Sequence, residues 1–242
     1  MKAYLVTGGS SGIGWATVER LLKKGKVINL DIHEPSNPHP QLTTHICDLS
    51  DHLATVKCLT SLNVEFDGIF LNAGRHHSAN IDNIMLDDLV AVLNLNVVSY
   101  VNIIHTLRKF NRIKTQGSIV LCGSDQCFIA KSNSLAYTIS KGAIAQMTKS
   151  MALDLSTIPI RVNAVCPGTI DTPLYQRAVQ KYCQRSGADH QAVHMDEANA
   201  QPLGRIGQAE EVATLVDFLL DNQQSSFITG ALMPIDGGYT AK

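Results

Sequence analysis

The sequence Lys2-Ala3-Tyr4-Leu5-Val6-Thr7-Gly8-Gly9-Ser10-Ser11-Gly12-Ile13-Gly14 decides the fold. Residues 2 to 6 predict a short apolar strand. After the glycines, apolar residues recur at helical spacing as far as Lys23-Lys24-Gly25, where Gly25 is expected to stop the helix. Val27 to Asp31 predicts a second strand that ends in an acid. The order is therefore strand, glycine-rich turn, helix and strand.

These parts match the mechanics of a dinucleotide-binding site. Glycines tighten the turn and let the backbone approach a pyrophosphate, which rests on the helix N-terminus. The spacing here is G-x-x-x-G-x-G, with Gly8, Gly12 and Gly14, and Asp31 follows where a carboxylate can accept hydrogen bonds from an adenosine ribose. A plain helix-entry turn is the alternative, and three glycines together with the acid argue against it.

Composition sets wider limits on the protein. The chain has 242 residues, is 45% hydrophobic and carries a formal net charge of -1, which gives no nucleic-acid footprint. We expect no apolar run of membrane-spanning length and no signal peptide, and hence a cytoplasmic protein. The six cysteines form no Cys-x-x-Cys pair, so we expect reduced and mostly buried thiols rather than disulfides or a metal site.

Strand and helix patterns alternate about seven times. Strands are expected at residues 44–47, 67–71, 118–122, 160–165 and 231–235, and helices at about 51–61, 86–110, 137–155 and 210–220. This alternation predicts a single-domain α/β Rossmann fold over residues 1–242, with a doubly wound parallel sheet of about seven strands and helices on both faces. Residues 173–203 are polar and poorly periodic, which is typical of a substrate lid, here at about 170–205.

A candidate acid/base pair lies in Ala136-Tyr137-Thr138-Ile139-Ser140-Lys141. Tyr137 and Lys141 are four apart, so a helix places them on one face, and the apolar stripe that begins at Ile144 continues that face inward. An inward lysine is unusual unless its charge is needed there. Ser124 ends the preceding strand, and a short loop can bring it beside Tyr137.

Two further polar features remain open from the sequence. Asn96 lies inside an apolar helical stripe, either as a core amide tied to backbone or as a group aimed at a site or a water. The loop Arg75-His76-His77-Ser78 is read as exposed or as part of a substrate entrance. Neighbouring histidines rarely bind one metal ion and no third ligand is evident, so no metal is expected.

The chain resembles the short-chain dehydrogenase/reductase family over nearly its whole length. The resemblance is carried in order by Thr7-Gly8-x-x-x-Gly12-Ile13-Gly14, Asp48, Asn72-Ala73-Gly74, Asn96, Ser124, Tyr137-x-x-x-Lys141, Pro167-Gly168 and Ile235-Asp236-Gly237-Gly238. Two positions depart from the usual pattern. Leu71 stands where the family has asparagine, and Gly123 where it often has serine, and neither change removes a reacting group.

The resemblance implies which residues form the site. It implies catalysis by Asn96, Ser124, Tyr137 and Lys141, with Ser124 and Tyr137 holding the substrate. The residues it implies for cofactor binding are Gly8, Ser10, Ser11, Gly12, Ile13, Gly14, Asp31, Asp48, Leu49, Asn72, Ala73, Gly74, Tyr137, Lys141, Pro167, Gly168, Ile170 and Thr172.

The same resemblance implies hydride transfer between a nicotinamide and a secondary alcohol or ketone. Tyr137 then moves the hydroxyl proton, Ser124 polarises the substrate oxygen, Lys141 also holds the ribose, and Asn96 holds a water that relays protons through Lys141. A free phenol has a pKa near ~10, and an ammonium at ~5 Å, with an effective dielectric of ~20, lowers it by about 2 units.

Cofactor choice follows from Asp31, which binds the ribose 2′-hydroxyl of NAD and repels the 2′-phosphate of NADP, so NAD is expected. A 3-oxoacyl-[acyl-carrier-protein] reductase is the near alternative, because Arg177, Lys181 and Arg185 offer a basic patch in the lid. A non-catalytic dinucleotide sensor is the alternative of another class. The family likeness also implies a homotetramer or homodimer that acts on a small molecule.

Overall fold

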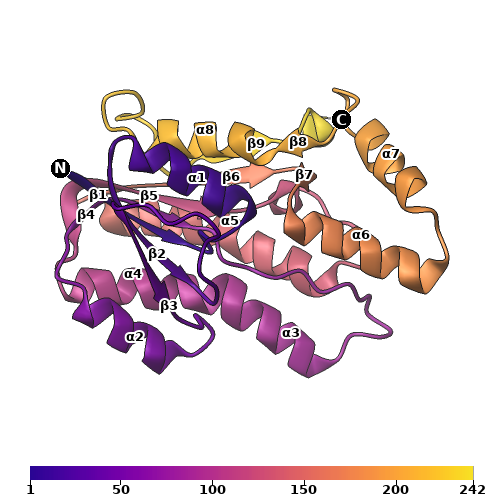
Figure 1. Ribbon diagram of the computed structural model, residues 1–242, viewed down its shortest axis with the longest axis horizontal. Coiled ribbons are helices and arrows are strands. Elements are labelled where there is room, and N and C mark those ends of the chain that lie inside the picture. Colours follow the sequence, from indigo (N-terminus) through magenta and orange to yellow (C-terminus); the bar gives the residue numbers. More distant parts are fainter. Residues whose placement is uncertain (242) are drawn as a thin grey trace.

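Seven parallel strands form one sheet, as the sequence predicts, and the computed structural model describes residues 1–241 (Figure 1). The strands are β1 (Lys2–Thr7), β2 (Gly25–Asp31), β3 (Leu42–Ile46), β4 (Phe66–Leu71), β5 (Ile113–Cys122), β6 (Arg161–Pro167) and β9 (Leu232–Ile235). Their order in the sheet is β3-β2-β1-β4-β5-β6-β9, so the chain leaves β1 in one direction and later returns to its other side at β4. Ligands of such sheets bind at this switch point, beyond the C-terminal ends of the strands.

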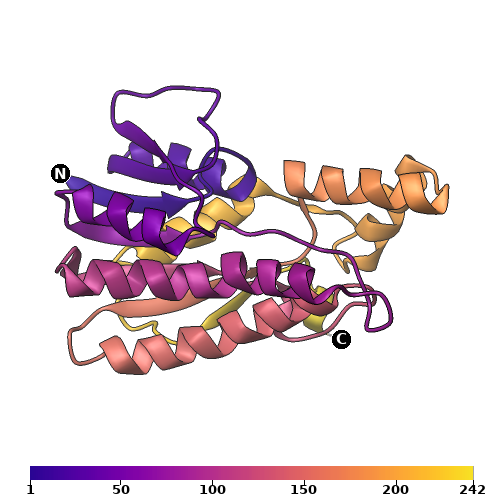
Figure 2. The same ribbon diagram turned by 90° about the horizontal axis from the view of Figure 1, so that it is seen from below.

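Helices cover both faces of the sheet. On one face lie α1 (Gly12–Leu22) and α8 (Ala209–Leu220), which pack against each other (Figure 1). The other face is covered by α2 (His52–Ser61), α3 (Leu86–Leu93), the π-helical turn η1 (Asn94–Val98), α4 (Ser99–Lys109) and α5 (Leu135–Leu155), and α5 runs beside α3 and η1 (Figure 2). The shorter elements are η2 (Asp125–Cys127), β7 (Ile170–Asp171), α6 (Pro173–Ser186), α7 (His190–Ala200), β8 (Gly207–Gln208) and η3 (Tyr239–Ala241).

Side chains of the central strands alternate between two apolar layers. Leu5 and Ile69 belong to the layer that includes Tyr100 of α4 and Ile144 of α5, whereas Tyr4 and Phe70 join the layer under α1 and α8. Because helices bury both faces, strands such as β6 read as continuous buried runs, which is typical of a parallel sheet.

Two expected segments differ in the structure. Gly25 does not stop a helix: α1 ends at Leu22, and Gly25 begins β2, where a Cβ would lie 2.2 Å from the Lys2 carbonyl oxygen of β1. Residues 173–203 are largely helical, although their sequence is poorly periodic. Thr172 caps α6, Gly187 ends it with a left-handed conformation, and Asp189 caps α7, so local capping defines helices that bury few side chains.

The helical segment Leu86–Lys109 differs from a third expectation. It is long and apolar enough to cross a membrane, by length and composition alone, although we expected no such run. Its α3 and η1 portions lie against α5, and its α4 portion lies against α2. Tyr100, Ile103 and Leu107 are fully buried, so this segment supplies one side of the core.

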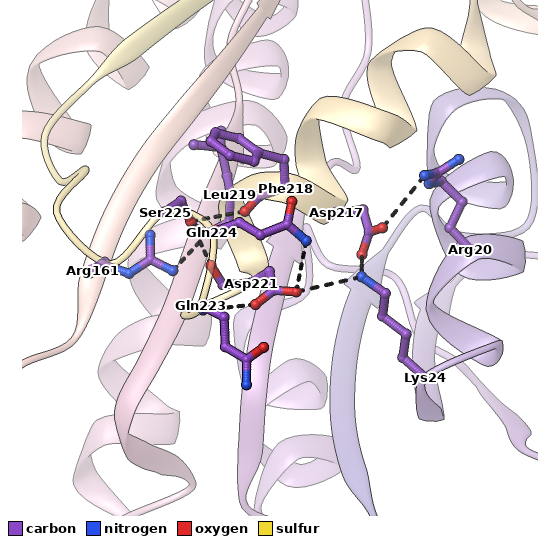
Figure 3. Close-up of polar contacts among 10 residues, drawn as sticks. All are labelled: Arg20, Lys24, Arg161, Asp217, Phe218, Leu219, Asp221, Gln223, Gln224 and Ser225. Carbon is purple, nitrogen blue, oxygen red and sulfur yellow. Dashed lines mark hydrogen bonds and ion pairs between the residues drawn. The ribbon is translucent and has the colours of Figure 1, made fainter.

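A cluster of charges fastens α1 to α8 (Figure 3). Asp217 of α8 lies 2.5 Å from Lys24 Nζ and 3.6 Å from Arg20 Nη2, and its side chain is only 12% exposed. Lys24 also lies 3.9 Å from Asp221. At the adjacent end of the helix, Arg161 of β6 donates to the Leu219 carbonyl over 2.9 Å. These contacts join the end of α8 both to α1 and to the sheet.

We expect Asp217→Ala to lower the free energy of unfolding by about 1–3 kcal/mol, because it leaves two cations without their shared, buried partner. Urea unfolding followed by circular dichroism measures the change. Asp154→Ala, at an exposed position of α5, is the matched control and should change stability by less than about 0.5 kcal/mol. Equal effects of the two substitutions would show that the cluster adds no stability.

Candidate active site

The glycine turn between β1 and α1 is shaped by a very close backbone approach. A Cβ on Gly14 would lie 2.0 Å from the Gly8 carbonyl oxygen and 2.7 Å from Asn72 Nδ2, so no larger residue fits there. Gly8 itself has φ of 66°, in the left-handed region that favours glycine. The first turn of α1 is therefore held directly against the ends of β1 and β4.

Asn29 of β2 supports this turn by hydrogen bonds to Gly9 and Ser10. It was not predicted as part of the site. It is fully buried in β2, where Oδ1 accepts from the Gly9 backbone N–H over 2.8 Å and Nδ2 donates to Ser10 Oγ over 2.9 Å. The signal was present in the sequence, because an asparagine inside the apolar run Val27-Ile28-Asn29-Leu30 must find partners in the core.

Asp31 lies where the end of β2 meets the glycine turn. Its Oδ2 accepts from the Ser10 backbone N–H over 2.9 Å, and its Oδ1 accepts from the His33 backbone N–H over 3.1 Å. Ser11, the N-cap of α1, makes no side-chain cap hydrogen bond, so the first N–H groups of the helix are left for another acceptor. An anion-binding helix end beside a fixed carboxylate fits the pyrophosphate and ribose of a dinucleotide.

The neighbouring strand ends are tied together by Thr7. Its Oγ1 accepts from the backbone N–H groups of Asn72 and Ala73, over 2.9 and 3.1 Å, and Asn72 Nδ2 donates to the carbonyls of Thr7 and Gly8. At the end of β3, Asp48 is exposed, and hydrogen bonds from the hydroxyl and backbone of Ser50 lower its pKa. The following Leu49 is buried.

The segment after β6 returns to the glycine turn. Gly168 donates its backbone N–H to Ile235 of β9 over 3.1 Å, and Ile170 is buried in β7. Thr172 then lies against the turn, because a Cβ on Gly12 would come within 3.3 Å of its side chain. These cofactor-site candidates from distant parts of the sequence thus meet at one end of the sheet.

Ser124, Tyr137 and Lys141 converge at the same end. Ser124 follows β5, and its hydroxyl lies close enough to Tyr137 of α5 to lower the pKa of the phenol. Lys141 is 3% exposed, its Nζ lies 5.2 Å from the centre of the Tyr137 ring, and it donates to the Cys122 carbonyl over 2.7 Å. The helical i, i+4 spacing therefore does place the phenol and the ammonium together.

The electrostatics of the pair differ in one respect from expectation. Burial raises the pKa of Tyr137, and the charge of Lys141 and, to a smaller extent, the neighbouring Ser124 lower it without cancelling the effect of burial. Burial opposes the charge of Lys141, but its neighbours Tyr137 and Cys122 raise its pKa overall, so the ammonium persists. A base at position 137 thus needs more positive charge than the lysine alone supplies, as an oxidised nicotinamide would provide.

Asn96 is anchored by its side chain. Its Oδ1 accepts from the Arg75 backbone N–H over 2.9 Å, and its Nδ2 donates to the Arg75 carbonyl and to Ser140 Oγ. Asn96 lies in η1, where the helix widens to a π-turn, a feature frequent at functional sites. The geometry matches a core amide tied to backbone, directly beside the loop that follows Gly74.

The two loop histidines have different surroundings. His76 packs edge-on against the Tyr137 ring with centroids 5.1 Å apart, and its Nε2 lies 3.2 Å from Ser134 Oγ. Burial, followed by the charges of His77 and Lys131, lowers the pKa of His76, so it is neutral at pH 7. His77 points instead toward Asp88, at 3.6 Å. His76 thus packs directly against the phenol.

Asp125 is a second residue that sequence reasoning missed. It follows Ser124 directly, is 2% exposed, and accepts from the Ser124 hydroxyl over 2.6 Å. Its other oxygen lies 2.8 Å from Lys131 Nζ. The sequence signal was an acid immediately after a strand-end serine, but burial of the acid and its pairing with Lys131 depend on the fold of the loop.

Within the part of the chain that the structure describes, the cysteines form neither disulfides nor a metal site. All six cysteines are free, and among residues 1–241 no cluster of histidine, cysteine and acidic side chains could hold a metal ion.

A cavity of about 640 Å³ lies between β7 and helices α6 and α7, lined by Tyr175, Arg177 and His194 among others. It does not include Ser124 or Tyr137, so it is separate from the reacting groups.

Comparisons with known proteins agree with this geometry. Residues 8–240 match a family model described as Enoyl-(Acyl carrier protein) reductase. A solved short chain dehydrogenase family protein from Francisella tularensis subsp. tularensis SCHU S4 is 51% identical, with a TM-score of 0.96 and full coverage of both chains. The aldohexose dehydrogenase of Thermoplasma acidophilum is 32% identical, with a TM-score of 0.90, over 100% of this chain and 94% of its own. A 3-oxoacyl-[acyl-carrier-protein] reductase of Thermotoga maritima is 29% identical over 98% of this chain and 97% of its own.

Proposed function

Because this chain belongs to the short-chain dehydrogenase/reductase family of oxidoreductases, we propose that it is an NAD(H)-dependent enzyme that interconverts a secondary alcohol and its ketone. The observation that carries the proposal is the convergence of Ser124, Tyr137 and Lys141 at the same end of the sheet as the glycine turn. When bound, the nicotinamide supplies the hydride chemistry. The turn around Gly8 and Gly14, the free N-terminus of α1 and the Asp31 carboxylate fit such a dinucleotide.

The residues then divide the work as follows. Tyr137 takes the hydroxyl proton during alcohol oxidation and returns it during ketone reduction. Lys141 holds a positive charge beside the phenol and supports the ribose, and Ser124 orients the substrate oxygen. Asn96 keeps η1 against the Arg75 loop and positions the water that passes protons through Lys141. His76, neutral and beside Tyr137, forms one wall of the substrate site.

Three broader features belong to the same proposal. Residues 1–242 act as one domain, with 170–205 as the substrate lid. Thr169 donates to Glu197 of α7 over 2.9 Å, and Tyr175 of α6 lies 3.2 Å from His194 of α7, so the lid helices are linked to each other and to the sheet end. The enzyme acts in the cytoplasm, in keeping with its six free thiols.

A second candidate, a 3-oxoacyl-[acyl-carrier-protein] reductase, is favoured by one observation. Arg177, Lys181 and Arg185 are exposed on α6 at four-residue intervals, which aligns three cations on one face of the helix. Such a stripe suits an acidic carrier protein. A screen of NADH formation against aliphatic, cyclic, steroid, sugar and polyol alcohols, with acetoacetyl-coenzyme A tested in the reverse direction, separates the two candidates.

We expect Tyr137→Phe to lower kcat by about 10²- to 10⁴-fold, because the substituted enzyme has no group to move the hydroxyl proton. In the unsubstituted enzyme, oxidation should rise with pH through the pKa of Tyr137, since the phenolate is the base, and reduction should fall over the same range. Tyr4→Phe removes a buried phenol far from the site and is the control. Undiminished turnover by Tyr137→Phe would refute the mechanism, and absence of turnover in every protein would support a dinucleotide sensor.

We expect NAD to bind more tightly than NADP, because Asp31 accepts hydrogen bonds from ribose hydroxyls and repels a 2′-phosphate. Asp31→Ala should weaken NAD binding by about 10- to 100-fold and improve NADP binding, as measured by calorimetry. Glu34→Ala removes a nearby exposed acid and should leave both affinities within about twofold. Tighter NADP binding by the unsubstituted protein, with no loss of NAD binding in Asp31→Ala, would contradict the assignment.

We also propose that the chain forms a homotetramer or homodimer through the helices of its long segment. Val90, Val98 and Val101 are 62%, 45% and 45% exposed along α3, η1 and α4, which leaves an apolar face uncovered. Val98→Glu combined with Val101→Glu should produce monomers in light scattering after size exclusion. Leu53→Glu, an exposed position of α2, should not change the mass. A monomeric unsubstituted protein would exclude this assembly.

A further inference from the structure

A buried carboxylate lies directly behind the serine of the site. Asp125 is 2% exposed in η2, and the charged end of its side chain has two partners, one for each oxygen. Burying a carboxylate is costly unless it is paired and hydrogen-bonded, so both partners matter. One of them is Ser124, which handles the substrate oxygen in the proposed function, and the other is Lys131.

The hydroxyl proton of Ser124 is already donated to Asp125. A serine hydroxyl has one hydrogen to donate, and Ser124 donates it to Asp125 Oδ1 over 2.6 Å. The serine oxygen also accepts from the Gln126 backbone N–H over 3.2 Å. A hydrogen bond to a carboxylate is about twice as strong as one between neutral groups. A substrate oxygen that needs the serine proton must therefore compete with Asp125.

Lys131 determines how strongly Asp125 competes with a substrate oxygen for the Ser124 proton. Its Nζ lies 2.8 Å from Asp125 Oδ2, and the same ammonium lies 4.6 Å above the Tyr239 ring of η3. The ammonium offsets part of the carboxylate charge, which weakens the pull of Asp125 on the serine proton. Asp125 is almost fully inaccessible, so it acts on the substrate only through Ser124.

We propose that Asp125 is a positioning residue that holds the Ser124 proton away from the substrate oxygen, with Lys131 as the counter-charge that moderates this hold. The inference rests on the proposed function. A ketone oxygen can only accept, so it gains a hydrogen bond from Ser124 only by drawing the serine proton from Asp125, and it binds weakly. An alcohol donates its own hydroxyl hydrogen to Tyr137 and does not need the serine proton in order to bind. The pair therefore favours bound alcohol and speeds release of ketone.

Thermodynamics restricts how the effect is distributed. The overall equilibrium constant is fixed, so with NAD and NADH affinities unchanged, kcat/KM must change by the same factor in both directions. Freeing the serine proton stabilises the bound ketone and the transition state together. Freeing the serine proton should therefore lower KM for the ketone and raise kcat for the alcohol. If Asp125 had a merely structural role, its substitution would lower kcat in both directions and would not lower KM for the ketone selectively.

The test uses the best alcohol from the screen above, its own ketone, and three substitutions. We expect Asp125→Asn to lower KM for the ketone by about 5- to 10-fold, with KM for the alcohol within about twofold. Lys131→Gln should raise KM for the ketone by a similar factor, because the carboxylate then holds the serine proton more strongly. The double substitution should resemble Asp125→Asn, since Lys131 acts only through Asp125.

Lys114→Gln is the matched control. It removes an ion pair of similar length, 2.9 Å to Asp67, at a lysine of comparable exposure on β5, and it should change neither KM. Shifts of the ketone KM in the same direction for Asp125→Asn and Lys131→Gln, or no shift in either, would overturn the inference while leaving the proposed function intact. If Asp125→Asn fails to fold, the sign of the Lys131→Gln effect decides. Absence of turnover in the unsubstituted protein overturns both proposals.

Discussion

The contact between Gly14 and the Gly8 carbonyl oxygen is the constraint on which the site depends. A single added carbon would meet that oxygen at 2.0 Å, so α1 can begin at this place only if both positions lack side chains. This approach brings the free N–H groups of the first helical turn to the switch point of the sheet. Asn29 of β2 then fixes the turn by accepting from the Gly9 backbone N–H, and Thr7 ties the end of β1 to the segment after β4.

The second requirement is a charge inside the protein. Lys141 is almost fully buried, yet it stays protonated because the Cys122 carbonyl and the Tyr137 phenol surround it with electron-rich groups. The same burial raises the pKa of the phenol it serves. Chemistry at neutral pH therefore cannot depend on the lysine alone. In the proposed function, oxidised nicotinamide beside the phenol is the source of the additional positive charge, which would couple proton transfer to cofactor binding.

The sequence was enough to predict the parallel sheet, its two helix layers and the family, because glycine spacing, strand-end polar residues and the Tyr-Lys spacing are local patterns. The helices α6 and α7 were not predicted. In α6, Tyr175, Val179 and Tyr182 do recur at helical spacing, but the many polar residues between them masked the stripe. α7 has almost no apolar stripe and is marked chiefly by its cap, Asp189. Asn29 and Asp125 escaped notice for another reason. The local sequence shows only that each needs a partner, and only long-range packing shows what its oxygens bind.

The geometry around Ser124 connects the reacting centre to the end of the chain. Tyr239 belongs to η3, its ring faces Lys131, and Lys131 pairs with the carboxylate that holds the serine proton. Asp236 fixes this terminal turn, because its carboxylate accepts from the backbone N–H groups of Gly238 and Thr240. A residue after the last strand therefore helps to place the cation that moderates Asp125. If Asp125 acts through Ser124 as we propose, substrate preference depends on electrostatics that begin outside the group of residues that touch the substrate.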